Sequence, residues 1–131
     1  MVLTEDACRD IVRVSKNKFE DGYYADSVET AFKEINKRVK KIVKARIGKE
    51  LDGAGLMYQA FSEQSPIIIL DDLGSQTGRD IQKGYMQIFA GSMIGIRNPK
   101  AHDNIIISKD RAIHFIFLAS LLMYKLDDAT C

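Results

Sequence analysis

The residues best suited to chemistry are an arginine and a histidine that stand five positions apart late in the chain, Arg97 and His102. An arginine is permanently charged, and its planar N–H donors match the oxygens of a phosphate. A histidine titrates near neutral pH, at about 6.5, so it can accept or donate a proton under ordinary conditions. Together the two side chains can support metal-free cleavage of RNA. The histidine would handle the proton of the 2′-hydroxyl or of the leaving group, while the arginine would stabilise the charge that grows on the phosphorane.

The two residues belong to a longer motif, Gly91-Ser92-Met93-Ile94-Gly95-Ile96-Arg97-Asn98-Pro99-Lys100-Ala101-His102. This motif resembles the signature of the HEPN superfamily, in which an arginine is followed by a polar residue and, a few positions later, by a histidine. More narrowly it looks like the Ymh family, which has an Ala-Gly and then an Ile-Arg-Asn-Pro-x-Ala-His core. The resemblance covers most of the chain, because it extends upstream through Phe19-Glu20-Asp21-Gly22-Tyr23-Tyr24-Ala25, Ala31-Phe32-Lys33, Leu51-Asp52-Gly53, Leu56-Met57, Ala60-Phe61, Gly78 and Gly84.

The resemblance implies an α-helical bundle that forms a homodimer, with the motifs of two subunits making one site. Active HEPN members cut RNA without a metal or other cofactor, in toxin–antitoxin, abortive-infection and other antiviral systems. By position, Arg97 and His102 are implied as catalytic residues and Asn98 as the polar residue that orients them. Some HEPN toxins carry a tyrosine two residues after the histidine, which a partner antitoxin modifies. This chain has Asn104 there, which argues against that mode of control by an antitoxin or other regulatory protein.

A second feature is a strongly basic face on the helix expected over residues 25–47. Lysine and arginine supply most contacts to a nucleic-acid backbone, so this face is the best candidate for an RNA surface. The alternative interpretation is an ordinary solvated face. The candidate RNA-binding residues, which include one lysine of the motif, are Lys37, Arg38, Lys40, Lys41, Lys44 and Lys100.

Four segments with the periodicity of amphipathic helices must position these residues. We expect helices over residues 5–19, capped by Thr4, over 25–47, from 77 or 79 to 96, and over 109–126, capped by Ser108. Pro99 is expected to stop the third helix, with Asn98 outside helical angles, so that Arg97 and His102 face one crevice between the last two long helices. Short connections favour antiparallel neighbours, and the sequence therefore predicts an all-α, up-and-down four-helix bundle.

The middle of the chain, residues 48–78, is the least regular part. A short helix is possible over residues 56–61. Two β-branched runs, residues 67–70 and 105–107, could pair as a small β-ribbon, although two strands alone are marginally stable. The alternative is an irregular insertion.

Length and composition favour one globular domain spanning residues 1–131. The net charge is only +1, so the whole-protein field does not by itself indicate nucleic acid. Cys8 and Cys131 are interpreted as reduced thiols, and no zinc-binding spacing occurs. The N-terminus lacks the pattern of a signal peptide, and the most apolar stretch, residues 112–126, suits a buried helix better than a membrane span. We therefore expect a cytoplasmic protein.

Several other features are weighed and set aside. The acid pairs Asp71-Asp72 and Asp127-Asp128 have no further ligands at metal-binding spacing. His114 lies in an apolar run, where a core or interface histidine is expected. The apolar last helix and the small residues at 90–95 predict a two-fold symmetric homodimer. Two functions remain open: an active endoribonuclease, or a non-catalytic module that dimerises or binds nucleic acid or protein.

Overall fold

The computed structural model describes residues 8–129, and this part of the chain is all-α, as the sequence predicts. Thr4, the start of the first expected helix and Cys131 lie outside the described residues. The first described helix begins with Cys8 as its N-cap, and the thiol of Cys8 is free and buried. In chain order, the helices are α2 (Arg9–Glu20), α3 (Tyr24–Ile47), α4 (Gly53–Ala60), α5 (Gln76–Ser92), the π-helix η1 (Met93–Arg97), α6 (Asn98–His102) and α7 (Lys109–Asp127).

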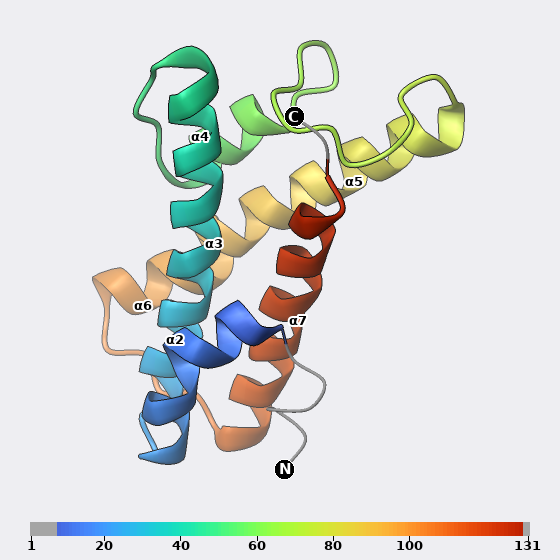
Figure 1. The fold of residues 1–131 in the computed structure, drawn as a ribbon. Helices are drawn as coiled ribbons and strands as arrows, with labels where there is room; N and C mark the ends of the chain where they lie inside the picture. The colour runs from blue at the N-terminus through green and yellow to red at the C-terminus, as the bar shows by residue number, and fades with distance from the viewer. Residues whose placement is uncertain (1–7, 130–131) are drawn as a thin grey trace.

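The long helices alternate in direction (Figure 1). α2 and α3 form a hairpin around a tight turn, and α3 and α7 then lie against each other and run the same way. α5 crosses behind them at an oblique angle and continues through η1 into α6, which reaches the side of α3. This path brings the motif of residues 97–102 against α3, and its first residues against the beginning of α4.

One core joins these helices, and α3 is its centre. The apolar stripe expected on α3 is buried at nearly every position, because its residues recur at helical spacing. The stripe consists of Val28, Phe32, Ile35, Val39 and Val43, with Ile42 at its edge. α7 begins at Ser108, whose hydroxyl accepts a hydrogen bond from the backbone N–H of Arg111 as predicted. No helix in the described part of the chain is long and apolar enough to cross a membrane.

The connection between α4 and α5 is irregular, so of the two alternatives the irregular insertion is confirmed and the β-ribbon is wrong. Both Ile67 and Ile68 donate their backbone N–H to the carbonyl of Ala60, at 2.9 Å each, so this run folds back onto α4. The buried carboxamide of Gln82 accepts from the N–H of Leu70 at 2.8 Å and donates to two carbonyls of the same connection. These local partners bind the N–H groups of Ile67, Ile68 and Leu70, and the run does not pair with residues 105–107. Residues 105–107 form a second irregular segment, in which Ile106 is 97% exposed.

The expected stop before Pro99 is also wrong. Asn98 has helical angles, φ −64° and ψ −42°, and the helix continues to His102 before Asp103 turns extended. Proline lacks the N–H that an α-helix would use at this point. Here the π-helix of residues 93–97 precedes the proline, and the N–H of Asn98 reaches back to the carbonyl of Met93. The wider turn places Pro99 in the first turn of α6, where its missing N–H costs nothing.

Candidate functional site

Arg97 turns inward from the end of η1, and only 14% of its side chain is exposed. Its Nε and Nη2 both donate to the Oδ1 of Asn98, at 3.1 and 3.0 Å. Its Nη1 donates to the Oδ1 of Asp52, at 3.4 Å. Asn98 thus contacts one edge of the guanidinium through a single oxygen.

Asp52, the residue before α4, is itself fixed by α3. The carboxamide of Asn36 is buried on α3, and its Nδ2 donates to the Oδ1 of Asp52 at 2.5 Å. The Oδ1 of Asn36 accepts from the backbone N–H of Gly53 at 3.0 Å. Gly53 has a φ of +63°, and a Cβ added there would lie 3.2 Å from the Nη2 of Arg97. The guanidinium therefore lies against bare backbone, which a glycine permits in both conformation and space.

The electrostatics of this cluster favour the charged carboxylate. The pKa of Asp52 is lowered, mainly because Asn36 donates a hydrogen bond to the carboxylate and also because Arg97 and Lys40 place positive charge nearby; burial opposes them. Hydrogen bonds to the ionised form stabilise that form. At neutral pH the cluster thus holds a carboxylate beside two cationic side chains.

The guanidinium keeps donors for a ligand. Arginine has five N–H groups, and the contacts to Asn98 and Asp52 use three of them. One N–H on each η nitrogen remains. Two such donors match the bidentate recognition of a phosphate.

His102 lies in quite different surroundings. It is the exposed last residue of α6 and lines a shallow hollow with Lys100, Ala101, Asp103 and Asn104. In an ideal α-helix, residues five apart point about 140° from one another. Arg97 thus packs against α3 and α4, and the expectation that it shares a crevice between α5 and α7 with His102 is corrected. Within residues 8–129, no hydrogen bond joins the two side chains.

The six basic candidates separate into two groups. Three of them form ion pairs within the chain: Arg38 with Asp127 at 2.6 Å, Lys44 with Glu50 at 2.6 Å, and Lys100 with Asp26 at 2.9 Å. The carboxylate of Asp26 raises the pKa of Lys100 by accepting its hydrogen bond.

The other three basic candidates share one face of α3. Lys37 and Lys41 are exposed, and no ion pair of either occurs within the described range. Lys40 is half-buried and close enough to Asp52 to lower the pKa of that carboxylate. The structure therefore brings Lys40, but not Arg38, to the Arg97 cluster.

Sequence reasoning did not assign a part to Asn36 or Asp52. They are 61 and 45 positions before Arg97, so nothing local pointed to them, although the Leu51-Asp52-Gly53 run was part of the family resemblance. His114 is exposed, so of the two expected positions, core or interface, the core is excluded. Asp71 pairs with Lys125 at 3.9 Å, and over residues 8–129 no group of three potential metal ligands converges.

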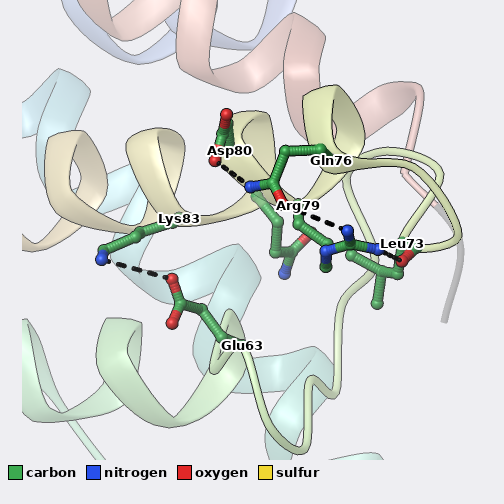
Figure 2. Close-up of a pocket in the computed structure, with 7 residues that line it drawn as sticks. Glu63, Leu73, Gln76, Arg79, Asp80 and Lys83 are labelled. Atoms are coloured by element: carbon green, nitrogen blue, oxygen red, sulfur yellow. Dashed lines mark hydrogen bonds and ion pairs between the residues drawn. The ribbon is translucent and has the colours of Figure 1, made fainter.

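A separate pocket of about 260 Å³ lies between the α4–α5 connection and the start of α5 (Figure 2). Its polar groups mostly bind one another. Arg79 donates to the carbonyl of Leu73 at 3.0 Å, Gln76 donates to Asp80 at 2.9 Å, and Lys83 lies 3.8 Å from Glu63. The pocket therefore leaves few groups to recognise a ligand, and the Arg97 cluster is the stronger candidate.

Fold and motif together define a small helical protein with an Arg-Asn-Pro-x-Ala-His motif at the end of a long helix. The chain belongs to the family described as "Protein of unknown function (Hypoth_ymh)", whose model matches residues 7–126. No curated protein and no solved structure matches the chain.

Proposed function

We propose that this protein is a metal-independent endoribonuclease of the HEPN type. The observation that carries the proposal is the arrangement of Arg97, which Asn98 holds by one edge while two N–H donors remain, five residues before the exposed His102. In the proposed reaction, the 2′-hydroxyl oxygen attacks the adjacent phosphorus and the bond to the 5′-oxygen breaks. His102 moves the proton of the nucleophile or of the leaving oxygen, and Arg97 stabilises the phosphorane. The products are a 2′,3′-cyclic phosphate and a 5′-hydroxyl.

The proposed active form is a homodimer, in which two motifs complete one site. An exposed stripe of small and apolar residues supports it, running along α5 and η1 directly into the motif. Its glycines have open space around them, so the backbone of a second helix could approach closely. On α7, Leu121 and Tyr124 are also exposed, at 51% and 47%. The stripe consists of Gly84, Ile88, Gly91, Ile94 and Gly95.

The proposed substrate is single-stranded RNA, with Lys37, Lys40 and Lys41 meeting its backbone and Lys100 close to His102. A cytoplasmic protein with this activity would act in phage defence or as the toxin of a toxin–antitoxin pair, under an antitoxin or another regulatory protein.

The test is to incubate the purified protein with single-stranded RNA in the presence of a chelator. We expect cleavage that leaves a 2′,3′-cyclic phosphate, and no cleavage by the Arg97→Ala/His102→Ala double variant. DNA of the same sequence lacks the 2′-hydroxyl nucleophile and should stay intact. Cleavage that survives the double change, or that stops with chelator, would place the site elsewhere.

One observation favours the second candidate, a non-catalytic module that binds RNA or protein. Arg97 already has an ion-pair partner in Asp52, as an arginine with a purely structural part would. The same experiment separates the two functions, because the module would bind RNA without cutting it under any condition.

A further inference from the structure

The geometry points to Asp52 and Asn36 as positioning residues that fix the guanidinium of Arg97 in a phosphate-binding orientation. This inference rests on the proposed function, since it concerns the same site. It assigns a part to two residues that lie outside the motif and on other elements of the fold.

The first step is the rigidity of the anchor. Both ends of the Asn36 carboxamide are engaged, by Asp52 on one side and by the N–H of Gly53 on the other, and the residue is only 8% exposed. It cannot rotate without breaking two hydrogen bonds in a buried place, where an unpaired polar group is costly. Asp52 is therefore held by α3, although its own side chain is 60% exposed.

The second step is the orientation of Arg97. An arginine side chain has many rotamers, and holding it in one of them costs up to about 2 kcal/mol of conformational free energy. Here Asn98 contacts one edge, Asp52 contacts Nη1, and the backbone at Gly53 lies against Nη2. Two parts of the fold, the start of α4 and the start of α6, thus restrain the plane of the guanidinium before any phosphate arrives, and such preorganisation is what a charge-stabilising group requires.

The third step is why an acid here does not block an anion. The contact between Asp52 and Arg97 is long, at 3.4 Å, and it uses one of the two Nη1 donors. The oxygen that makes it is shared with Asn36 at 2.5 Å, so the carboxylate is held mainly toward α3. Lys40 lies near Asp52 and offsets its charge. Asp52 therefore directs the guanidinium and leaves an N–H on each η nitrogen for the phosphate.

The test compares Asp52→Ala and Asn36→Ala with the conservative Asp52→Asn, which keeps an acceptor oxygen for both Asn36 and Arg97. We expect the alanine variants to lower kcat on RNA by roughly 10- to 100-fold with little change in KM, because a misplaced group loses most in the transition state. Asp52→Asn should recover most of kcat. Combining Asn36→Ala with Asp52→Ala should cost no more than either alone, since both act through one contact. The matched control is Glu50→Ala, an exposed acid two positions away.

A second readout does not depend on cleavage. The Nε–H of Arg97 should give a protected signal in a ¹⁵N NMR spectrum, which shifts when inorganic phosphate is added. Asn36→Ala should broaden or lose the signal, and Glu50→Ala should keep it. If the native protein cuts no RNA while the signal behaves as expected, the proposed function fails and the positioning stands.

Two results with the alanine variants would overturn the inference. In the first, Asp52→Ala raises kcat or tightens phosphate binding, which would make Asp52 an inhibitory contact. In the second, the Arg97 signal is unchanged in Asn36→Ala and Asp52→Ala, which would mean that Asn98 alone orients the arginine. Asp52→Asn keeps the test decisive if an alanine variant does not fold, because a large loss of kcat in that variant would show that charge, and not position, matters.

Discussion

The two ends of the motif differ more in their surroundings than five positions of sequence suggest. Arg97 is mostly buried and is held by side chains from the start of α4 and from α6, with α3 behind them. His102 is exposed at the end of a five-residue helix, beside an irregular segment. Under the proposed function, the chain itself fixes the charge-stabilising residue, Arg97, and leaves the proton-transferring residue, His102, exposed to a second subunit or to the RNA.

This difference has a physical reason. A charge-stabilising group works best when it is fixed in advance, because its reorganisation would otherwise add to the barrier. A general acid or base needs only to come within hydrogen-bonding reach of its proton in the bound complex. In the proposed mechanism, a single chain is therefore expected to hold Arg97 in place and to leave His102 free to meet the bound complex.

The largest expected effect is on catalysis, where the two ends should act as equals despite their different surroundings. His102→Ala should slow RNA cleavage by roughly 10²–10⁴-fold, the usual worth of a positioned acid–base group. Arg97→Ala should slow it by roughly 10²–10³-fold, as removal of a charge-stabilising donor does. The measurement is a single-turnover rate on a labelled RNA. A loss below about threefold for either variant would remove that residue from the chemistry.

The free energy of unfolding should distinguish Arg97→Ala from His102→Ala. Arg97→Ala leaves Asn98 and Asp52 without their shared partner, and loss of a partly buried, charge-assisted contact costs about 1–3 kcal/mol. His102→Ala removes an exposed side chain and should stay within about 0.5 kcal/mol of the native protein. Urea denaturation measures both. Equal loss in the two variants would mean that His102 is packed in the form present in solution, as an interface residue would be.

The sequence predicts the helical frame well, because that frame follows from periodic burial. α3 was expected over residues 25–47 and spans Tyr24–Ile47, and its C-cap Gly48 has the left-handed conformation that commonly ends a helix. The Ser108 cap of α7 was also correct. For both helices, the capping residue and the apolar periodicity predict the same boundary.

The sequence-based predictions fail where contacts with other parts of the fold determine the local structure. The run at residues 67–70 has the composition of a strand, but the N–H groups of Ile67, Ile68 and Leu70 bind Ala60 and Gln82. Pro99 was expected to end a helix, but the π-helix before it places Pro99 in the first turn of α6, where no N–H donor is required. Asn36 and Asp52 could not be assigned to Arg97, since only the fold brings residues so far apart into contact. The motif of residues 97–102 could be identified from the sequence, but the residues that hold Arg97 in place could not.

Two glycines test whether the placement of Arg97 matters for cleavage, because Gly53 lies beside its guanidinium and Gly48 has open space around it. Gly53 and Gly48 both have positive φ, +63° and +70°, but a Cβ at Gly48 meets nothing within 4 Å. Alanine should therefore cost each position a similar backbone penalty, roughly 1–2 kcal/mol. Only Gly53→Ala should also slow RNA cleavage, because its Cβ would lie 3.2 Å from the Nη2 of Arg97. Similar cleavage rates for the two variants would show that Arg97 tolerates displacement.

A smaller effect should come from the basic face of α3. Lys37→Ala and Lys41→Ala should each weaken RNA binding and reduce the slope of affinity against salt by about one, if each lysine meets one phosphate. Cleavage at saturating RNA should not change. The control is Lys83→Ala on α5, whose ammonium lies near Glu63 on another part of the surface. Unchanged RNA affinity and unchanged salt dependence in both α3 variants would identify this face as ordinary solvated surface.

The smallest expected effect concerns pH, and it tests whether Asp52 is held by a hydrogen bond or only by charge. The pKa of Asp52 in the folded protein lies below its ordinary value of 3.8, so the folded state binds the proton less readily than the unfolded state does. Its contribution to stability is therefore present above about pH 4 and is lost as the pH falls through the lowered pKa. Asp52→Asn lacks this proton, and the stability difference from the native protein should shrink as the pH drops below about 4.

Glu50 provides the comparison, because its pKa is also lowered, first by a hydrogen bond from Lys44 and then by the charges of Lys44 and Lys40, at an exposed position. Salt at about 0.5 M screens such exposed charges. The pH-dependent difference should thus nearly vanish in salt for Glu50→Gln. It should persist for Asp52→Asn, because the hydrogen bond from the buried, neutral carboxamide of Asn36 is the largest cause there. Urea titrations at several pH values, with and without salt, measure both. Equal loss in salt would mean that charge alone holds Asp52, and the placement of Arg97 would then rest on Asn98.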